Sequence, residues 1–274
     1  MNEEQIKARL MNIAREQKKT FNDLLKPLSF ERLLARVGKS QHRSKLIFKG
    51  GLCLKQFVNS DRETTDIDFL VKKVDSQIET IRGVFEEVLS IEMDDSFQFS
   101  LIDCTKLEVQ HKKYPGYRIN IQVNLGKTRD RLQVDLGIGD IVDEFEMQLD
   151  VVQYKGNPLI SEAGVSILAY PPEFIFSEKL QAIIELGSLN SRMKDYFDCY
   201  VLMTKDILDE NKVKQAINKT FKNRKTDIQA IETASEEIIG LWTAFQKKVP
   251  TAPRAIEDVI MKINNYLINI KVIK

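Results

Sequence analysis

Hydrophobic residues recur at helical spacing in the first part of the chain. Ile6, Leu10 and Ile13 lie three or four residues apart, which predicts an amphipathic helix over residues 3–18. A second helix is expected over residues 21–37, ending at Gly38. We therefore expect an N-terminal arm of helices over residues 1–43.

The pattern changes to short apolar runs after this arm. Residues 46–48 predict a buried strand, and the diglycine Gly50-Gly51 predicts a turn into a helix that reaches about residue 58. Residues 66–71 predict a second strand, and Asp75 is a candidate cap for a helix that extends to residue 89. Strands and helices thus alternate here.

From residue 97 onward, apolar and polar side chains alternate with a period of two. The alternation predicts strands around residues 97–101, 119–123 and 134–138, and a further strand is expected within residues 146–154. After Pro171-Pro172 the spacing becomes helical to the end of the chain. Helices are expected near residues 172–186, 193–205, 210–221, 228–248 and 253–270.

The order of elements predicts an α/β (α+β) fold with a mixed sheet. The expected organisation is a helical arm (residues 1–43), a core with the sheet (residues 44–160) and a C-terminal helical domain (residues 161–274).

Composition narrows the possible chemistry. The chain has 274 residues with 41 basic and 40 acidic side chains, so its overall charge does not indicate a nucleic-acid partner. Only a local patch of basic residues could indicate one. The three cysteines are widely spaced, which argues against a disulfide framework and fits a reducing cytoplasm. With two histidines, a histidine-ligated metal or a Ser-His-Asp triad is disfavoured. An acidic N-terminus and the lack of a bilayer-length apolar stretch predict a cytoplasmic protein without a membrane partner.

Asp66 and Asp68 are the strongest candidates for chemistry. Alternate residues of a strand share one face, so these two carboxylates lie close together and repel unless a cation sits between them. Mg²⁺ takes a few protein oxygens and completes its shell with water and phosphate, which favours a site for a nucleoside triphosphate. Thr65 and Arg62 precede the pair. The alternative is an ordinary solvated strand.

A third carboxylate is expected where metal ions share ligands or a base is needed. Asp135 is the best candidate because it occupies the polar face of a predicted strand, and Asp140 and Asp150 are competitors. The diglycine suits a close approach of phosphate at a helix N-terminus, although it could serve packing alone.

The helical half carries two further candidates. Lys179 flanks an apolar stripe and could reach a phosphate or simply extend along the surface. Arg192, Asp195 and Asp198 are three residues apart on one helix face, beside packed aromatic residues. They predict either a local ion pair or a site.

The chain resembles AbiEii/AbiGii-type nucleotidyltransferase toxins in the order of its motifs. These are KGG, R-x-x-T-D-x-D, a lone strand Asp, a helical Lys and R-x-K-D-x-x-D. These toxins belong to type IV toxin–antitoxin or abortive-infection (phage defence) pairs, and the wider resemblance is to polymerase-β-like nucleotidyltransferases. The resemblance implies Mg²⁺ on Asp66 and Asp68, with Asp135 as the third carboxylate. The expected catalytic residues are Asp66, Asp68, Asp135, Lys179 and Asp195. The expected nucleotide-binding residues are Lys49, Gly50, Gly51, Arg62, Thr65, Lys179, Arg192 and Asp198.

The implied activity is Mg²⁺-dependent transfer of a nucleoside monophosphate from an NTP to an acceptor hydroxyl. The resemblance implies RNA as acceptor, with the tRNA 3′ end favoured, and a cognate antitoxin that acts without a stable complex. Two basic groups could contact RNA phosphates and could equally be solvated faces. One is a predicted hairpin with Lys112, Lys113 and Arg118, and the other is a basic run near a helix end with Lys212, Lys214, Lys219, Lys222, Arg224 and Lys225. A small-molecule (antibiotic-type) or protein nucleotidyltransferase and a catalytically silent nucleotide-binding module remain as alternatives.

Overall fold

The computed structural model describes residues 1–58, 62–107, 116–160 and 164–274, which form two compact units. The first unit comprises Met1–Leu52, Thr65–Gly139 and Glu144–Ala169. The second comprises Cys53–Thr64, Asp140–Asp143 and Tyr170–Lys274. Helix α3 (Gly50–Leu54) carries the chain from the first unit into the second.

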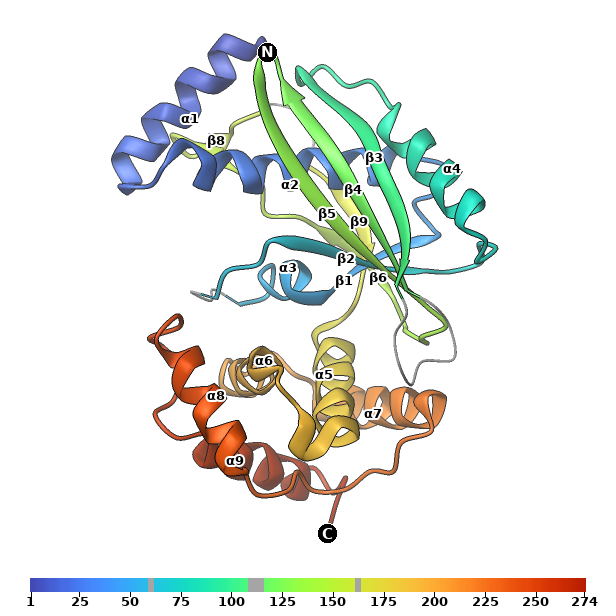
Figure 1. Ribbon diagram of the computed structural model, residues 1–274, viewed down its shortest axis with the longest axis vertical. Coiled ribbons are helices and arrows are strands. Elements are labelled where there is room, and N and C mark those ends of the chain that lie inside the picture. The colour runs from blue at the N-terminus through green and yellow to red at the C-terminus, as the bar shows by residue number, and fades with distance from the viewer. Residues whose placement is uncertain (59–61, 108–115, 161–163) are drawn as a thin grey trace. The chain divides into compact units, whose positions relative to one another are not determined.

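A mixed seven-stranded sheet forms the first unit, with strand order β3-β4-β5-β2-β1-β9-β6 (Figure 1). Its strands are β1 (Leu46–Lys49), β2 (Asp66–Val71), β3 (Phe97–Leu107), β4 (Gly116–Leu125), β5 (Thr128–Ile138), β6 (Phe145–Gln148) and β9 (Ser166–Ala169). Strand β2 pairs antiparallel with β1 and parallel with β5. A separate two-stranded ribbon joins β7 (Gln153–Tyr154) to β8 (Asn157–Pro158).

Strands β4 and β5 form a hairpin whose register begins at the pair Leu125 and Thr128. The two residues between them are Gly126 and Lys127, and Gly126 adopts a positive φ of 57°. A two-residue turn with glycine at its first position matches the twist of antiparallel strands. The turn therefore sets which residues of β4 and β5 face each other.

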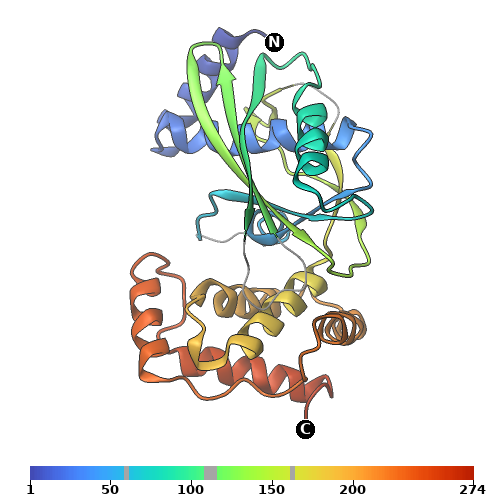
Figure 2. The same cartoon turned by 45° about the vertical axis from the view of Figure 1, so that its right-hand side comes forward.

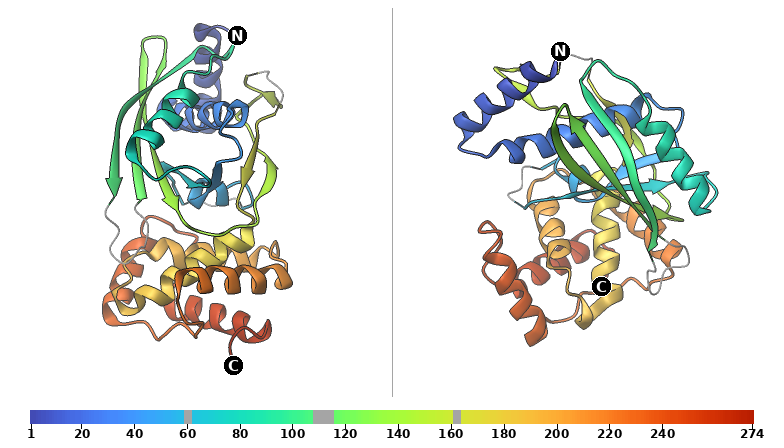
Figure 3. Two further views of the ribbon diagram at one scale, coloured as in Figure 1. Left: turned by 90° about the vertical axis from the view of Figure 1, so that its right-hand side faces the viewer. Right: turned by 45° about the horizontal axis from the view of Figure 1, so that its top comes forward.

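Helices α2 (Phe21–Lys39) and α4 (Ile78–Leu89) pack on the sheet, and α1 (Glu3–Gln17) packs against α2. Helix α2 packs against β5 and β9, and α4 packs against β3. In the left view of Figure 3, α2 lies between the β3–β5 side and the β9–β6 side of the curved sheet. The inward side chains of β4 and β5 are buried hydrophobic residues, so α2 and the sheet share one core.

Buried charges connect α2 to the start of β3. The Asp95 carboxylate is fully buried and accepts hydrogen bonds from Arg32 Nε at 2.9 Å and from both terminal nitrogens of Arg36 at 2.8 and 3.0 Å. It also accepts the backbone N–H of Phe97 at 3.0 Å. Burial alone would raise the pKa of Asp95, but the Arg36 hydrogen bonds and charge hold it below its ordinary value.

The second unit is helical (Figure 2). Its helices are α5 (Pro172–Leu186), α6 (Met193–Thr204), α7 (Glu210–Arg224), α8 (Glu236–Gln246) and α9 (Ile256–Asn269), with a 3₁₀ turn at Gly187–Leu189. Helix α5 packs against α6 and α7, and α6 packs against α8 and α9. The buried Trp242 donates its indole N–H to the carbonyl of Pro253 at 3.0 Å, which ties α8 to the segment before α9.

These elements confirm the mixed α/β fold, and the differences from the sequence expectations have local causes. Helix α2 continues through Gly38 to Lys39, and a Cβ atom at Gly38 would lie 2.5 Å from the carbonyl oxygen of Ser166, so glycine permits close packing there. Helix α3 ends at Leu54 and does not reach residue 58. Helix α8 begins at Glu236, not near residue 228, because Ser235 caps it.

Among the helices that the described residues form, none has the length and apolar character needed to cross a lipid bilayer.

We expect Asp95→Asn to lower the free energy of unfolding by about 3–5 kcal/mol at neutral pH, because it removes the carboxylate that pairs with the buried Arg36 and leaves Arg32 with Glu31 as its acidic partner. Urea unfolding followed by circular dichroism measures this change. Since folding lowers the pKa of Asp95, its contribution to wild-type stability is present above the unfolded-state value of about 3.9. It is lost as pH falls through the folded-state value. A destabilisation in Asp95→Asn that is equal at pH 7 and at pH 2 would contradict this assignment.

Candidate functional site

Three carboxylates come together in the first unit because of the pairing of β2 with β5. The parallel register places Asp68 opposite Asp135 and Asp66 opposite Gln133. Asp66 and Asp68 share a strand face, and the residue opposite Asp68 on a neighbouring strand projects to that same side. One oxygen from each of Asp66, Asp68 and Asp135 lies within 4.8 Å of the others.

This arrangement suits a hard divalent cation. All three side chains are partly exposed, so water and phosphate oxygens can reach them. Two unit charges about 4 Å apart repel by roughly 4 kcal/mol near a protein surface, and a cation among them removes that cost. The three carboxylates therefore fit Mg²⁺, which binds a few protein oxygens and keeps the rest of its shell for solvent and substrate.

Asp135 also has a protein counter-ion. Arg118 on β4 stands opposite Asp135 in the antiparallel register and donates from Nε and Nη2 to the two carboxylate oxygens, each at 2.8 Å. The sequence made Arg118 one of several basic residues that could contact RNA or could be solvated. The structure adds a partner within the protein, because Arg118 pairs with the third carboxylate of the cluster. The strand alternation was visible in the sequence, but the register that joins the two residues was not.

The diglycine lies beside the same carboxylates. Lys49 pairs in register with Asp68, and Gly50 follows with a positive φ of 74°. A Cβ atom at Gly50 would overlap the Asp68 carboxylate. Glycine is therefore required at this position by backbone conformation and by the close approach of Asp68. Gly51 continues into α3, and Thr65 is exposed directly before β2.

Other predicted site residues form a second cluster, within the second unit. Lys179 of α5 lies 2.8 Å from an oxygen of Asp195 and 2.7 Å from an oxygen of Asp198, both on α6. Arg62 donates from Nε and Nη2 to the two oxygens of Asp198 at 2.9 and 3.1 Å. Arg192 lies 3.1 Å from Asp195. Each unit thus brings together its own set of predicted residues.

This second cluster is largely buried. The side chains of Asp195 and Asp198 are 2% and 1% exposed, and that of Lys179 is 12% exposed, whereas Arg192 is 52% exposed. Burial favours the uncharged form of Lys179, but Asp198 and Asp195 outweigh it and raise the pKa of the ammonium. Burial likewise opposes the charge on Asp195, and Lys179 and Arg192 nevertheless lower its pKa. Lys179 is therefore a charged, enclosed residue rather than one that extends along the surface.

One of the basic residues of α7 is also engaged. Arg224 donates to both oxygens of Asp140 at 2.9 Å and lies 3.1 Å from Glu178. It therefore ties α7 to its own unit through two acidic side chains. Lys112 and Lys113, the other candidates of this kind near Arg118, lie outside the described residues.

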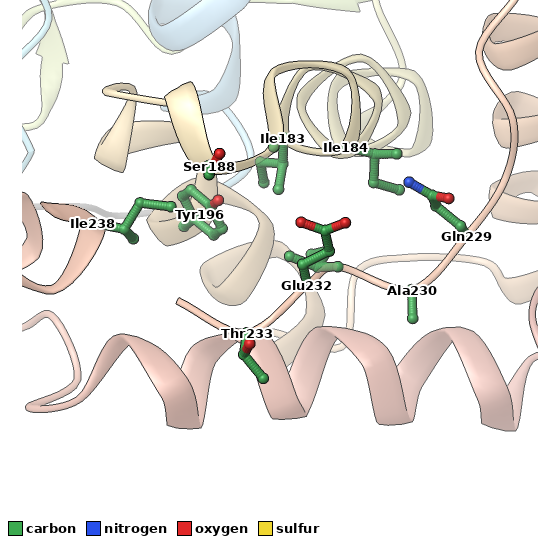
Figure 4. Close-up of a pocket in the computed structure, with 11 residues that line it drawn as sticks. Ile183, Ile184, Ser188, Tyr196, Gln229, Ala230, Glu232, Thr233 and Ile238 are labelled. Carbon is green, nitrogen blue, oxygen red and sulfur yellow. The ribbon is translucent and has the colours of Figure 1, made fainter. Parts of the chain in front are cut away.

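A separate small pocket in the second unit does not suit a nucleotide. Ile183, Tyr196 and Glu232 are among the residues that line it (Figure 4). Its accessible volume is about 40 Å³, whereas sites for small molecules are roughly 300–1,000 Å³. The carboxylate cluster of the first unit is the better candidate.

Comparisons with solved structures returned proteins of low similarity. JHP933 from Helicobacter pylori has 13% identity and a TM-score of 0.48, with 90% of each chain covered. An antigenic nucleotidyltransferase-like protein from Paracoccidioides brasiliensis has 11% identity and a TM-score of 0.39, with 78% of this chain and 97% of that chain covered. The antibiotic-resistance factor ANT(2'')-Ia has 14% identity and a TM-score of 0.35, with 72% and 90% covered. A search of curated proteins found no match.

A comparison with protein families gives a clear assignment. Residues 32–262 match the family described as nucleotidyl transferase AbiEii toxin, type IV TA system. The match spans most of the chain, including both clusters of predicted site residues, and confirms the family and the enzyme class that the sequence predicted. The chain therefore belongs to the AbiEii family of nucleotidyltransferase toxins of type IV toxin–antitoxin systems.

Proposed function

We propose that the protein transfers a nucleoside monophosphate from an NTP to a hydroxyl group of RNA and releases pyrophosphate, with Mg²⁺ as cofactor and the tRNA 3′ end as acceptor. The observation that carries the proposal is the group of three carboxylates, Asp66, Asp68 and Asp135, with oxygens within 4.8 Å of one another. The family assignment supports the nucleotidyltransferase chemistry, and the carboxylates support the metal.

The roles of the residues follow from their places in the first unit. Asp66 and Asp68 would hold the cation, and Asp135 would complete the set from the neighbouring strand. Mg²⁺ bound there would neutralise charge on the reacting phosphate and orient it for in-line displacement. Gly50 leaves the Asp68 carboxylate unobstructed, and Gly51 contributes its one backbone N–H at the start of α3.

In the second unit, Lys179, Arg192, Arg62, Asp195 and Asp198 remain predicted nucleotide-binding or catalytic residues. Arg192 is the most exposed charged side chain of this cluster, so it is the one that a phosphate group could reach most easily from solution. Lys179 and Asp198 have a structural role as well, because each neutralises a charge enclosed by α5 and α6.

The RNA acceptor is supported by exposed lysines on and beside α7. Lys212, Lys222 and Lys225 are exposed, and a phosphate backbone is attracted to such groups in a salt-dependent manner. The acceptor can be identified by incubating the protein with each labelled NTP and, separately, with tRNA, protein or aminoglycosides. Label on RNA supports the proposal, and label on protein or on the small molecule would replace the acceptor while leaving the transfer chemistry in place.

Asp66→Asn and Asp68→Asn should each reduce label transfer by at least about 100-fold, because each removes a ligand of the cation that would neutralise charge on the reacting phosphate. Transfer of α-labelled NTP to total RNA measures the loss, and thermal unfolding checks that each variant is folded. Asp130→Asn is a matched control, since Asp130 also lies on β5 but pairs with Lys26. Undiminished transfer by a folded Asp66→Asn, Asp68→Asn double variant would exclude the proposed site.

Lys179→Ala should lower the free energy of unfolding by about 1–3 kcal/mol, since it removes the cation shared by Asp195 and Asp198 and leaves each with one arginine partner. Denaturant unfolding measures this, with Lys194→Ala as control because Lys194 is exposed on the same helix as Asp195. A Lys179→Ala protein as stable as wild type would contradict the structural role. Loss of transfer by that stable protein would then point to direct contact with the nucleotide.

A further inference from the structure

Arg118 forms an ion pair with Asp135, one of the three carboxylates of the proposed metal site. Its guanidinium holds both oxygens of Asp135, each at 2.8 Å, in a fork-to-fork pair. The Gln133 amide lies against the same pair. With its oxygen turned toward Arg118, it accepts from Nε and Nη2 at 3.2 Å. Arg118 is therefore firmly held in this state of the protein.

Cation binding and this ion pair act on the same atoms. Asp135 contributes one of the three oxygens that lie within 4.8 Å of one another, and Arg118 donates to both of its oxygens. A divalent ion on Asp135 would face a guanidinium group across a single carboxylate. Two cations so placed repel each other, and the carboxylate oxygens are shared between them. Arg118 thus weakens the binding of a cation that arrives alone.

Arg118 also has donors to spare. A guanidinium carries five N–H donors, and the pair with Asp135 uses two of them. The side chain is 38% exposed, so a ligand can reach the remaining donors. Their fork geometry matches phosphate oxygens as well as it matches a carboxylate. When a cation binds Asp135, Arg118 loses its carboxylate partner. A triphosphate would then provide a new anion for the guanidinium group.

We propose that Arg118 is a positioning residue that couples cation binding to nucleotide binding, by holding Asp135 until a triphosphate takes over its guanidinium group. This inference rests on the proposed metal-dependent transfer. By linkage, the nucleotide increases cation affinity by the same factor by which the cation increases nucleotide affinity. The three carboxylates then fill with metal mainly when the substrate is present.

The test measures binding of Mn²⁺ by calorimetry, with and without an NTP analogue that cannot be cleaved at the α-phosphate. For the wild type we expect the analogue to tighten Mn²⁺ binding roughly tenfold, within the usual range for coupled sites. Arg118→Gln should bind Mn²⁺ alone roughly tenfold more tightly than wild type. The analogue should then tighten Mn²⁺ binding by a smaller factor than in wild type, because the direct phosphate–metal contact remains and the part of the coupling carried by Arg118 is gone.

Two comparisons isolate the contact. Arg129→Gln removes the same charge from an exposed position six residues from Asp135 on β5, about 20 Å away and beyond the screening length. It should leave Mn²⁺ affinity and coupling as in wild type. In an Asp135→Asn background, Arg118→Gln should no longer change Mn²⁺ affinity, because the two residues act through one another.

Kinetics provide an independent readout. Arg118→Gln should raise KM for the NTP more than it lowers kcat, since a phosphate contact present in the bound state is lost. Arg118→Lys keeps the charge without the fork and should lie between wild type and Arg118→Gln in Mn²⁺ affinity. It also serves as the test variant if Arg118→Gln does not fold.

A folded Arg118→Gln protein with wild-type Mn²⁺ affinity and wild-type coupling would overturn the inference while leaving the proposed function in place. If wild type, Asp66→Asn and Asp68→Asn all bind Mn²⁺ equally or not at all, the metal site itself is wrong and both proposals fail.

Discussion

The parallel pairing of β2 with β5 is the constraint on which the candidate site depends. Asp66 and Asp68 are neighbours by sequence, but Asp135 joins them because the register sets it opposite Asp68. Three carboxylates at this spacing are unfavourable together, so the sheet must impose the arrangement. Hydrogen bonding along β2 and β5, together with the hydrophobic side chains on the opposite face of both strands, provides that force. Hydrophobic packing on one face of the sheet thus offsets the repulsion among the three carboxylates on the other face.

The local pattern of hydrophobic and polar residues was sufficient to predict many of the helices and strands. Alternation placed β2 at residues 66–71 and identified Asp135 as an outward-facing strand residue, and helical spacing located α5 and α6 closely. These features depend on neighbours within a few residues, which a sequence displays directly. The same reasoning overestimated α3, because the apolar residues after the diglycine are packed without continuing the helix.

Long-range partners were beyond such reasoning. Arg118 looked like part of a basic hairpin until the β4–β5 register paired it with Asp135. Lys179 looked like a flanking residue until α6 supplied two carboxylates, and Arg224 looked like part of a basic run until Asp140 and Glu178 enclosed it. In each case the charge was evident in the sequence. What the charge does was decided by a residue at least 16 positions away.

The hairpin turn at Gly126 and Lys127 has a consequence far from its own position. Side chains alternate along β5, so the length of this turn decides whether Asp135 or a hydrophobic neighbour, Val134 or Leu136, stands across from Arg118. One added amino acid that shifted the β4–β5 ladder by a single step would set a hydrophobic residue of β5 opposite Arg118. The pairing of Arg118 with Asp135 therefore depends on a turn roughly 25 Å away along the strand, while the β2–β5 register independently holds Asp135 opposite Asp68.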